Sequence, residues 1–127
     1  MIHKIISVLK IGPKVNLVLD HTETETGEKI SGTFHISGGL VKQKLSRLEC
    51  DFIKEHAGGK AEVIEPVKTV LISRMIDTND RDQIPFTYQL PKDLNPTSDQ
   101  ITYRFRTKLV FNYDSKSMDH DEIIVNK

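Results

Sequence analysis

The chain has 127 residues, of which 37% are hydrophobic, and its 18 Lys and Arg residues balance 18 Asp and Glu residues. This length suits one domain with its own core, and a zero net charge argues against a nucleic-acid partner, whose binding needs a basic excess. The one cysteine, Cys50, excludes an intrachain disulfide and favours a reducing compartment. Because no apolar run approaches the length needed to span a bilayer, we expect a soluble, cytoplasmic protein rather than a membrane partner.

Residues 1–13 are predicted to be a lead-in to a single domain over residues 14–127. Ile2, Ile5, Ile6 and Leu9 fall on one face of a helix. About ten residues is too short for a helix that is stable alone in water. We therefore favour a segment that packs on the domain, and the alternative is a small helix that docks on a partner or a membrane surface.

Alternation of apolar and polar residues dominates the rest of the chain. Successive side chains of a strand point to opposite faces, so each alternating run predicts a strand with one buried and one wet face. Gly, Pro, Asn and Asp supply turn conformations between the runs. Several short strands of this kind predict an all-β, immunoglobulin-like antiparallel sandwich of about seven or more strands. The runs cover residues 15–19, 30–36, 48–52, 84–90 and 101–113, and the predicted turns cover 22–27, 37–39, 57–59, 77–82 and 91–99.

Three positions refine this prediction. The stretch from Val67 to Ile76 is apolar on both parities, which is typical of a strand buried on both faces. Pro85 removes a hydrogen-bond donor from its strand and therefore predicts either an edge strand or a strand that only just starts there. Cys50 shares parity with Leu48 and Phe52, so we interpret it as a small core residue rather than a reactive thiol.

No pattern of catalytic or metal-binding residues stands out. The five histidines are scattered singly, and Asp119–Glu122 is interpreted as an acidic turn before the last strand because neighbouring residues of an extended chain do not converge on one ion. The Asp77–Asp82 segment has Asp82 where a calcium loop needs glycine. We therefore expect no metal, no cofactor and no catalytic residues, and an enzyme is the minority hypothesis.

One feature suggests binding. Arg104, Arg106 and Lys108 are spaced by two residues, so all three lie on one face of one strand. Such a stripe could attract a phosphate, an acidic lipid head group or an acidic peptide. The alternative, favoured at zero net charge, is a solvated outer face on which these cations pair with Asp or Glu of the next strand.

Four segments of the chain resemble the bacterial sporulation-control protein family, in the same order. The first three are Gly27–Gly39, with the pattern G-E-x-V-x-G-x-V-x-I-x-G-G, Ile84–Pro91, with the pattern I-P-F-x-x-x-L-P, and the Tyr103–Leu109 strand. The fourth is Asp119–Val125, with the closing pattern D-x-D-x-I-x-V. The resemblance implies an arrestin-like sandwich in a regulator of the decision to sporulate that acts as a scaffold or adaptor. It provides no catalytic residues, and it implies a second, similar sandwich beyond the end of this chain.

The first functional hypothesis is therefore a non-enzymatic adaptor that binds protein partners through loops or a free sheet edge. A free edge offers unpaired N–H and C=O groups to an incoming strand and could also support a homodimer. The strand that contains Pro85 is the candidate edge. The alternative is a small-ligand or carbohydrate-binding sandwich, which is disfavoured because the chain has no Trp and most of its Tyr and Phe share parity with core positions.

Overall fold

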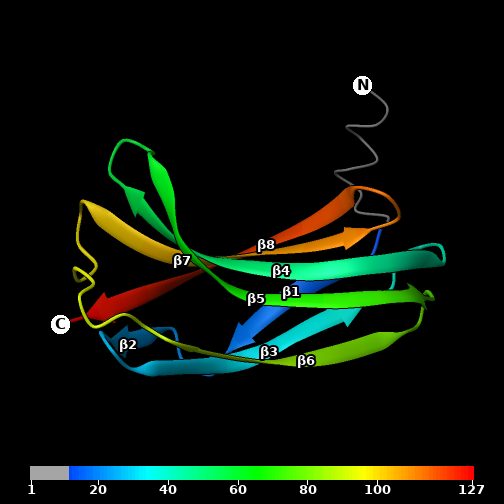
Figure 1. Cartoon of the computed structure of the whole chain (residues 1–127), viewed down its shortest axis with the longest axis horizontal. Coiled ribbons are helices and arrows are strands. Elements are labelled where there is room, and N and C mark those ends of the chain that lie inside the picture. The colour runs from blue at the N-terminus through cyan, green and yellow to red at the C-terminus, as the bar shows by residue number, and fades with distance from the viewer. Residues whose placement is uncertain (1–11) are drawn as a thin grey trace.

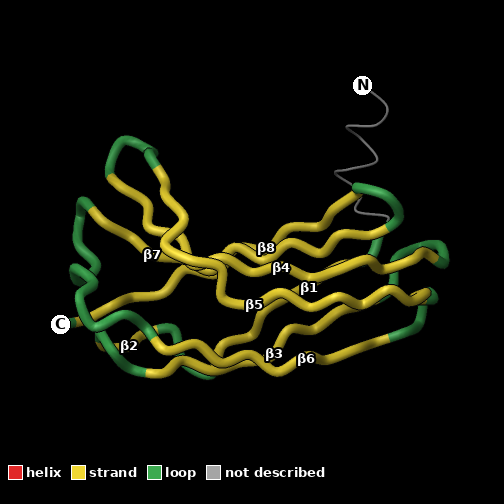
Figure 2. The backbone as a smooth tube through the Cα atoms, in the orientation of Figure 1, coloured by secondary structure: helices red, strands yellow, loops and turns green. Residues whose placement is uncertain are grey.

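The computed structural model describes residues 12–127, and the predicted lead-in helix over residues 2–9 lies outside this range. Within it the chain forms strands and loops only (Figure 2). The all-β prediction is confirmed. The eight strands are β1 (Lys14–Leu19), β2 (Glu23–Glu25), β3 (Lys29–Ser37), β4 (Gln43–His56), β5 (Ala61–Ile76), β6 (Arg81–Gln89), β7 (Ile101–Phe111) and β8 (Ser115–Asn126).

The strands form two sheets that face each other as the layers of a sandwich (Figure 1). One sheet has three strands in the order β1-β3-β6, and the other has five strands in the order β2-β8-β7-β4-β5. Strand β6 pairs with β3 alone and is therefore an edge, as Pro85 predicted. The far end of the β4–β5 hairpin rises beyond the layers (Figure 1).

Two predicted turns are strands instead. Residues 22–27 contain the three-residue strand β2, which pairs with β8. This pairing is parallel, whereas the sequence predicted an antiparallel sandwich. Its central residue, Thr24, is buried. The acidic segment Asp119–Glu122 lies inside β8, where its residues pair with β7. Both segments were predicted to be turns because they are polar, and their strand pairing depends on a partner strand that local composition does not reveal.

The core between the sheets is built around aromatic rings. Phe105 of β7 lies 5.2 Å from Phe52 of β4 and 5.1 Å from Phe86 of β6, measured between ring centroids. Tyr103 stacks on Phe52 at 5.5 Å, and Phe34 meets Phe86 edge-on at 5.3 Å. All five rings are buried. Since the rings come from both sheets, they join the two layers, and such pairs add to the free energy gained from burial alone.

Strand β5 is not the two-sided buried strand that its apolar composition predicted. It pairs with β4 alone, at the edge of the five-stranded sheet, and Leu71 is 80% exposed. Three register shifts against β4 each add a residue to β5. Each bulge adds one residue to β5, so the side chains that point inward change from odd to even positions or back. The partly buried apolar residues therefore do not alternate strictly along the strand. They are Ile64, Val67, Val70 and Ile72. The apolar residues at both odd and even positions of this segment are therefore explained by the bulges and not by burial on both faces of the strand.

The thiol of Cys50 is fully buried, as predicted, with the Thr107 hydroxyl 3.5 Å away. Desolvation raises the pKa of the Cys50 thiol to about 12, so little thiolate forms at neutral pH. We expect no reaction with a thiol reagent such as DTNB while the protein is folded, and stoichiometric reaction in denaturant. The increase in absorbance of the released thiolate measures both, and fast labelling of the native protein would contradict the prediction.

Candidate functional site

The predicted cationic stripe lies on the outer face of the five-stranded sheet, and each of its members faces a carboxylate of β4. Lys108 Nζ lies 3.2 Å from Glu49 Oε1, and Arg106 Nη2 lies 3.0 Å from Asp51 Oδ2. Arg104 is paired with Glu55. The stripe is thus one side of a ladder of ion pairs, the second of the two arrangements that the sequence allowed.

A fourth cation extends this ladder. Arg47 Nε donates to Glu49 Oε2 at 2.8 Å. The hydrogen bond from Arg47, together with the hydrogen bond and charge of Lys108, lowers the pKa of Glu49 against the opposing effect of its partial burial. Because three carboxylates face these four cations, the ladder presents little excess charge to an anion. Binding of an anionic partner by Arg104, Arg106 and Lys108 stays a prediction.

The ladder is expected to contribute little to stability. The side chains of Arg106 and Asp51 are 35% and 27% exposed, and ion pairs of that kind contribute about 0–1 kcal/mol. Arg106→Gln is therefore expected to lower the free energy of unfolding by less than about 1 kcal/mol. Urea denaturation at low and at high salt measures this change, and a loss that salt does not reduce would show a role beyond the ion pair.

Four strand edges are left free by the described topology, and β5 is the longest of them. Strand β2 has three residues, and β6 carries Pro85. Strand β1 lies against β8, where the Leu17 N–H donates to Asp119. Strand β5 has 16 residues and leaves three large apolar side chains at least 48% exposed, namely Val63, Leu71 and Met75.

The bulges divide this edge. The longest stretch of β5 in unbroken register with β4 is Lys68–Leu71, opposite Arg47–Cys50, with a register shift on each side. This four-residue stretch, which we call the β5 platform, ends at the exposed Leu71. The sequence analysis did not predict this exposed edge, because the apolar composition of the same residues predicted a buried strand.

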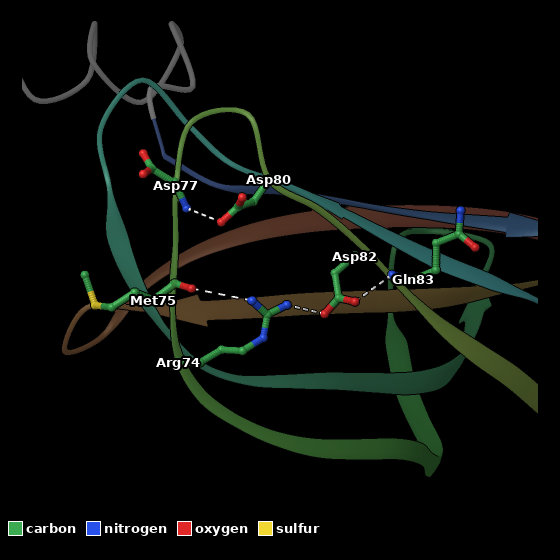
Figure 3. Close-up of polar contacts among 6 residues, drawn as sticks. All are labelled: Arg74, Met75, Asp77, Asp80, Asp82 and Gln83. Carbon is green, nitrogen blue, oxygen red and sulfur yellow. Dashed lines mark hydrogen bonds and ion pairs between the residues drawn. The ribbon is translucent and has the colours of Figure 1, made fainter.

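The end of β5 is tied to β6 across the gap between the two sheets (Figure 3). The Arg74 guanidinium of β5 forms an ion pair with Asp82 of β6 and also donates to the Met75 carbonyl. The second Asp82 oxygen accepts the Gln83 N–H at 3.0 Å. The turn between the strands is closed by Asp80, whose carboxylate accepts the Asp77 N–H at 2.8 Å. This network fixes one end of the edge and engages both oxygens of Asp82.

The opposite seam, between β1 and β8, contains two carboxyl groups that face inward. Asp119 Oδ2 accepts the Leu17 N–H of β1 at 2.8 Å. Asp121 lies two residues along β8, and within residues 12–127 no donor reaches its buried Oδ2. Burial, followed by a hydrogen bond to Asp119 and the charge of Asp119, raises the pKa of Asp121 to about 7. At neutral pH Asp121 is therefore about half protonated.

Sequence reasoning missed this pair because it interpreted Asp119–Glu122 as a turn. A signal was present, since Asp119 and Asp121 share parity with the core residues Ile123 and Val125. Two carboxyl groups do not make a metal centre, and no group of three or more metal-ligating side chains occurs within residues 12–127. In the same range no helix is long and apolar enough to cross a membrane.

Comparison with known proteins gives one family. The Spo0M family model, described as SpoOM protein, matches residues 2–127. The curated sporulation-control protein spo0M of Bacillus subtilis (strain 168) is 25% identical over 118 residues, which are 88% of this chain and 46% of the relative. The chain thus spans about half the length of the curated relative that it matches.

Solved structures agree with the fold. The crystal structure of Spo0M from Bacillus subtilis matches with a TM-score of 0.75 at 22% identity, over 91% of this chain and 50% of that one. A superoxide reductase (neelaredoxin) from Ignicoccus hospitalis matches with a TM-score of 0.57 at 12% identity, over 94% and 86% of the two chains. Likeness at these identities shows the fold alone. The first match confirms the predicted arrestin-like sandwich.

Proposed function

Since the chain belongs to the SpoOM protein family, we propose that it is a non-enzymatic regulatory domain that binds another protein. The process that we propose is the one in the name of the curated relative, the control of sporulation, and the proposed location is the cytoplasm. The observation that carries the binding role is the free edge of β5, with Leu71 80% exposed at the end of the β5 platform.

The chemistry of a free edge supports this role. Backbone N–H and C=O groups on the unpaired side of β5 can hydrogen-bond to a strand supplied by a partner, which gives affinity. Exposed side chains on alternate residues then give specificity. Thr69 and Leu71 lie on the outer face of the sheet, opposite Glu49 and Arg47, so an added strand would meet an apolar contact beside a charged ladder.

A carbohydrate-binding role has less support. Sugar sites in sandwich domains present aromatic rings to solvent, and most of the rings in this chain form its core. Tyr113 is the one aromatic residue of the described chain among its exposed large hydrophobic residues, and it lies on a turn between β7 and β8. One ring does not form a sugar-binding platform.

Affinity capture from cells of the source organism tests the proposal. The full chain is compared with Leu71→Lys, which places a charge on the β5 platform, and with Val18→Lys, a matched control at a 48% exposed position of β1. We expect a partner that is retained by the wild type and by Val18→Lys and is lost with Leu71→Lys. A partner that all three proteins retain equally would contradict the use of this edge.

Self-association is the competing outcome at the same edge. Sedimentation equilibrium of the purified chain distinguishes a homodimer from a complex with a different protein. A dimer that Leu71→Lys dissociates and Val18→Lys preserves would make a second copy the occupant of the β5 platform. A monomer at high concentration would remove the homodimer prediction and leave the partner proposal in place.

A further inference from the structure

Three cations at one end of the sandwich contrast with the neutralised ladder. Lys14 of β1, Arg81 of β6 and Lys116 of β8 all line an open cavity of about 1140 Å³. None of them forms an ion pair with a carboxylate of residues 12–127, whereas all members of the predicted stripe do. Residues 1–11 contain no Asp or Glu, so that segment has no acidic side chain with which to neutralise them.

Strand register places two of these cations on one surface. Lys14, Ser37 and Arg81 are aligned across β1, β3 and β6 and share the outer face of the three-stranded sheet. Because neighbouring strands lie about 4.8 Å apart, the backbones that carry Lys14 and Arg81 are about 10 Å apart. Two residues further along, the next aligned residues on this outer face also line the cavity, and they are Asn16, His35 and Gln83.

The two carboxylates in the lining are engaged elsewhere. Asp82 turns toward Arg74 of β5 and also accepts the Gln83 N–H (Figure 3). Asp119 accepts the Leu17 N–H at the β1–β8 seam. Neither of them pairs with Lys14, Arg81 or Lys116. The Arg81 guanidinium also donates to the Asp80 carbonyl at 2.9 Å. Alternation along β8 turns Lys116 to the outer face of the other sheet. The outer face of β1, β3 and β6 therefore combines two positive charges without an acidic partner, Lys14 and Arg81, with hydroxyl and amide groups that can donate hydrogen bonds.

We propose that this cavity binds a small compound that carries more than one phosphate charge. Phosphate oxygens accept several hydrogen bonds at once, and Arg and Lys are the side chains that recognise them. Cations whose backbones are about 10 Å apart suit a ligand with its charge spread over two or more groups better than a single monoanion. Lys14 and Arg81 would neutralise the charge, and Ser37, Asn16 and Gln83, on the same outer face, would orient the oxygens.

Isothermal titration calorimetry of the full chain with inorganic pyrophosphate tests the proposal. We expect binding by the wild type, and an affinity at least about tenfold lower in the double variant Lys14→Gln/Arg81→Gln, since each substitution removes a charge-assisted hydrogen bond. The matched control is Lys60→Gln, which removes an exposed cation from the loop between β4 and β5, away from the cavity, and should bind pyrophosphate as the wild type does. Equal loss in the control, or no wild-type binding at millimolar pyrophosphate, would overturn the proposal.

Two further arms identify the source of the phosphate. Binding of citrate as tightly as pyrophosphate would overturn the phosphate assignment. Sedimentation with vesicles of anionic phospholipid, in the absence of any pyrophosphate binding, would do the same by making a lipid head group the ligand. Should the double variant fail to fold by circular dichroism, Lys14→Gln replaces it, because this change leaves the hydrogen bond from Arg81 to the Asp80 carbonyl in place. Unchanged pyrophosphate binding by Lys14→Gln would then overturn the proposal, and weakened binding would support it.

Discussion

Replacing Phe105 with alanine is expected to lower the free energy of unfolding by about 3–5 kcal/mol, the usual loss for a buried phenylalanine. The ring is fully buried and meets Phe52 of its own sheet and Phe86 of the opposite sheet at centroid distances near 5 Å. Its removal leaves a cavity between the layers as well as losing the transfer free energy of the side chain. Small domains have a total stability of about 5–15 kcal/mol, so this single change removes a large part of it.

Urea denaturation followed by far-UV circular dichroism measures the loss. Tyr113→Ala is the control, since this ring is 98% exposed and its loss should change stability by at most about 0.5 kcal/mol. If Phe105→Ala does not fold, Phe105→Leu gives a smaller cavity and a measurable transition. Similar midpoints for Phe105→Ala and Tyr113→Ala would show that the ring does not join the sheets as described.

Replacing Asp121 with asparagine is expected to stabilise the protein at pH 8 and to have little effect near pH 4. Burial and Asp119 raise the pKa of Asp121 to about 7 in the folded state, against about 4 in an unfolded chain. The native protein therefore binds more protons than the unfolded chain between these values. Stability from this group is fully present below about pH 4 and is lost as the pH rises through about 7. An asparagine amide can donate to Asp119 at every pH without adding a charge.

Urea denaturation at a series of pH values measures this effect. The difference in unfolding free energy between Asp121→Asn and wild type should grow from pH 4 to pH 8 and level off above it. Asp114→Asn, at an exposed position in the β7–β8 turn, should show no such growth. A constant difference across the pH range would mean that Asp121 is ionised in the folded protein throughout.

The sequence predicted the sandwich and one of its edges because both depend on local chemistry. A run of alternating apolar and polar residues predicts a strand that is buried on one face. Proline lacks a backbone N–H in any context, so Pro85 indicates an edge strand without knowledge of the fold. The nature of β5 was beyond reach because the three bulges depend on register with β4, and register is set by the tertiary fold. The cation cluster was beyond reach for a similar reason. Lys14, Arg81 and Lys116 are far apart in the chain, and only the sheet order brings them to one cavity.

The predicted stripe shows the opposite difficulty. The spacing of Arg104, Arg106 and Lys108 correctly placed them on one face, but their partners on β4 decide whether that face carries net charge. Glu49, Asp51 and Glu55 have the matching spacing of β4. Reading the two strands together would have predicted the ladder, if their pairing had been known.

The bulges of β5 also bear on how this protein avoids aggregation. A long, flat edge with exposed apolar residues can recruit copy after copy and grow into a fibril. Here the longest regular part of the edge is Lys68–Leu71, with Pro66 and the positive φ of Ser73 close to its two ends. A strand that adds at this place gains few hydrogen bonds beyond those four residues. We therefore expect the irregular backbone of β5 to limit any added strand to a short pairing, which opposes growth into a fibril.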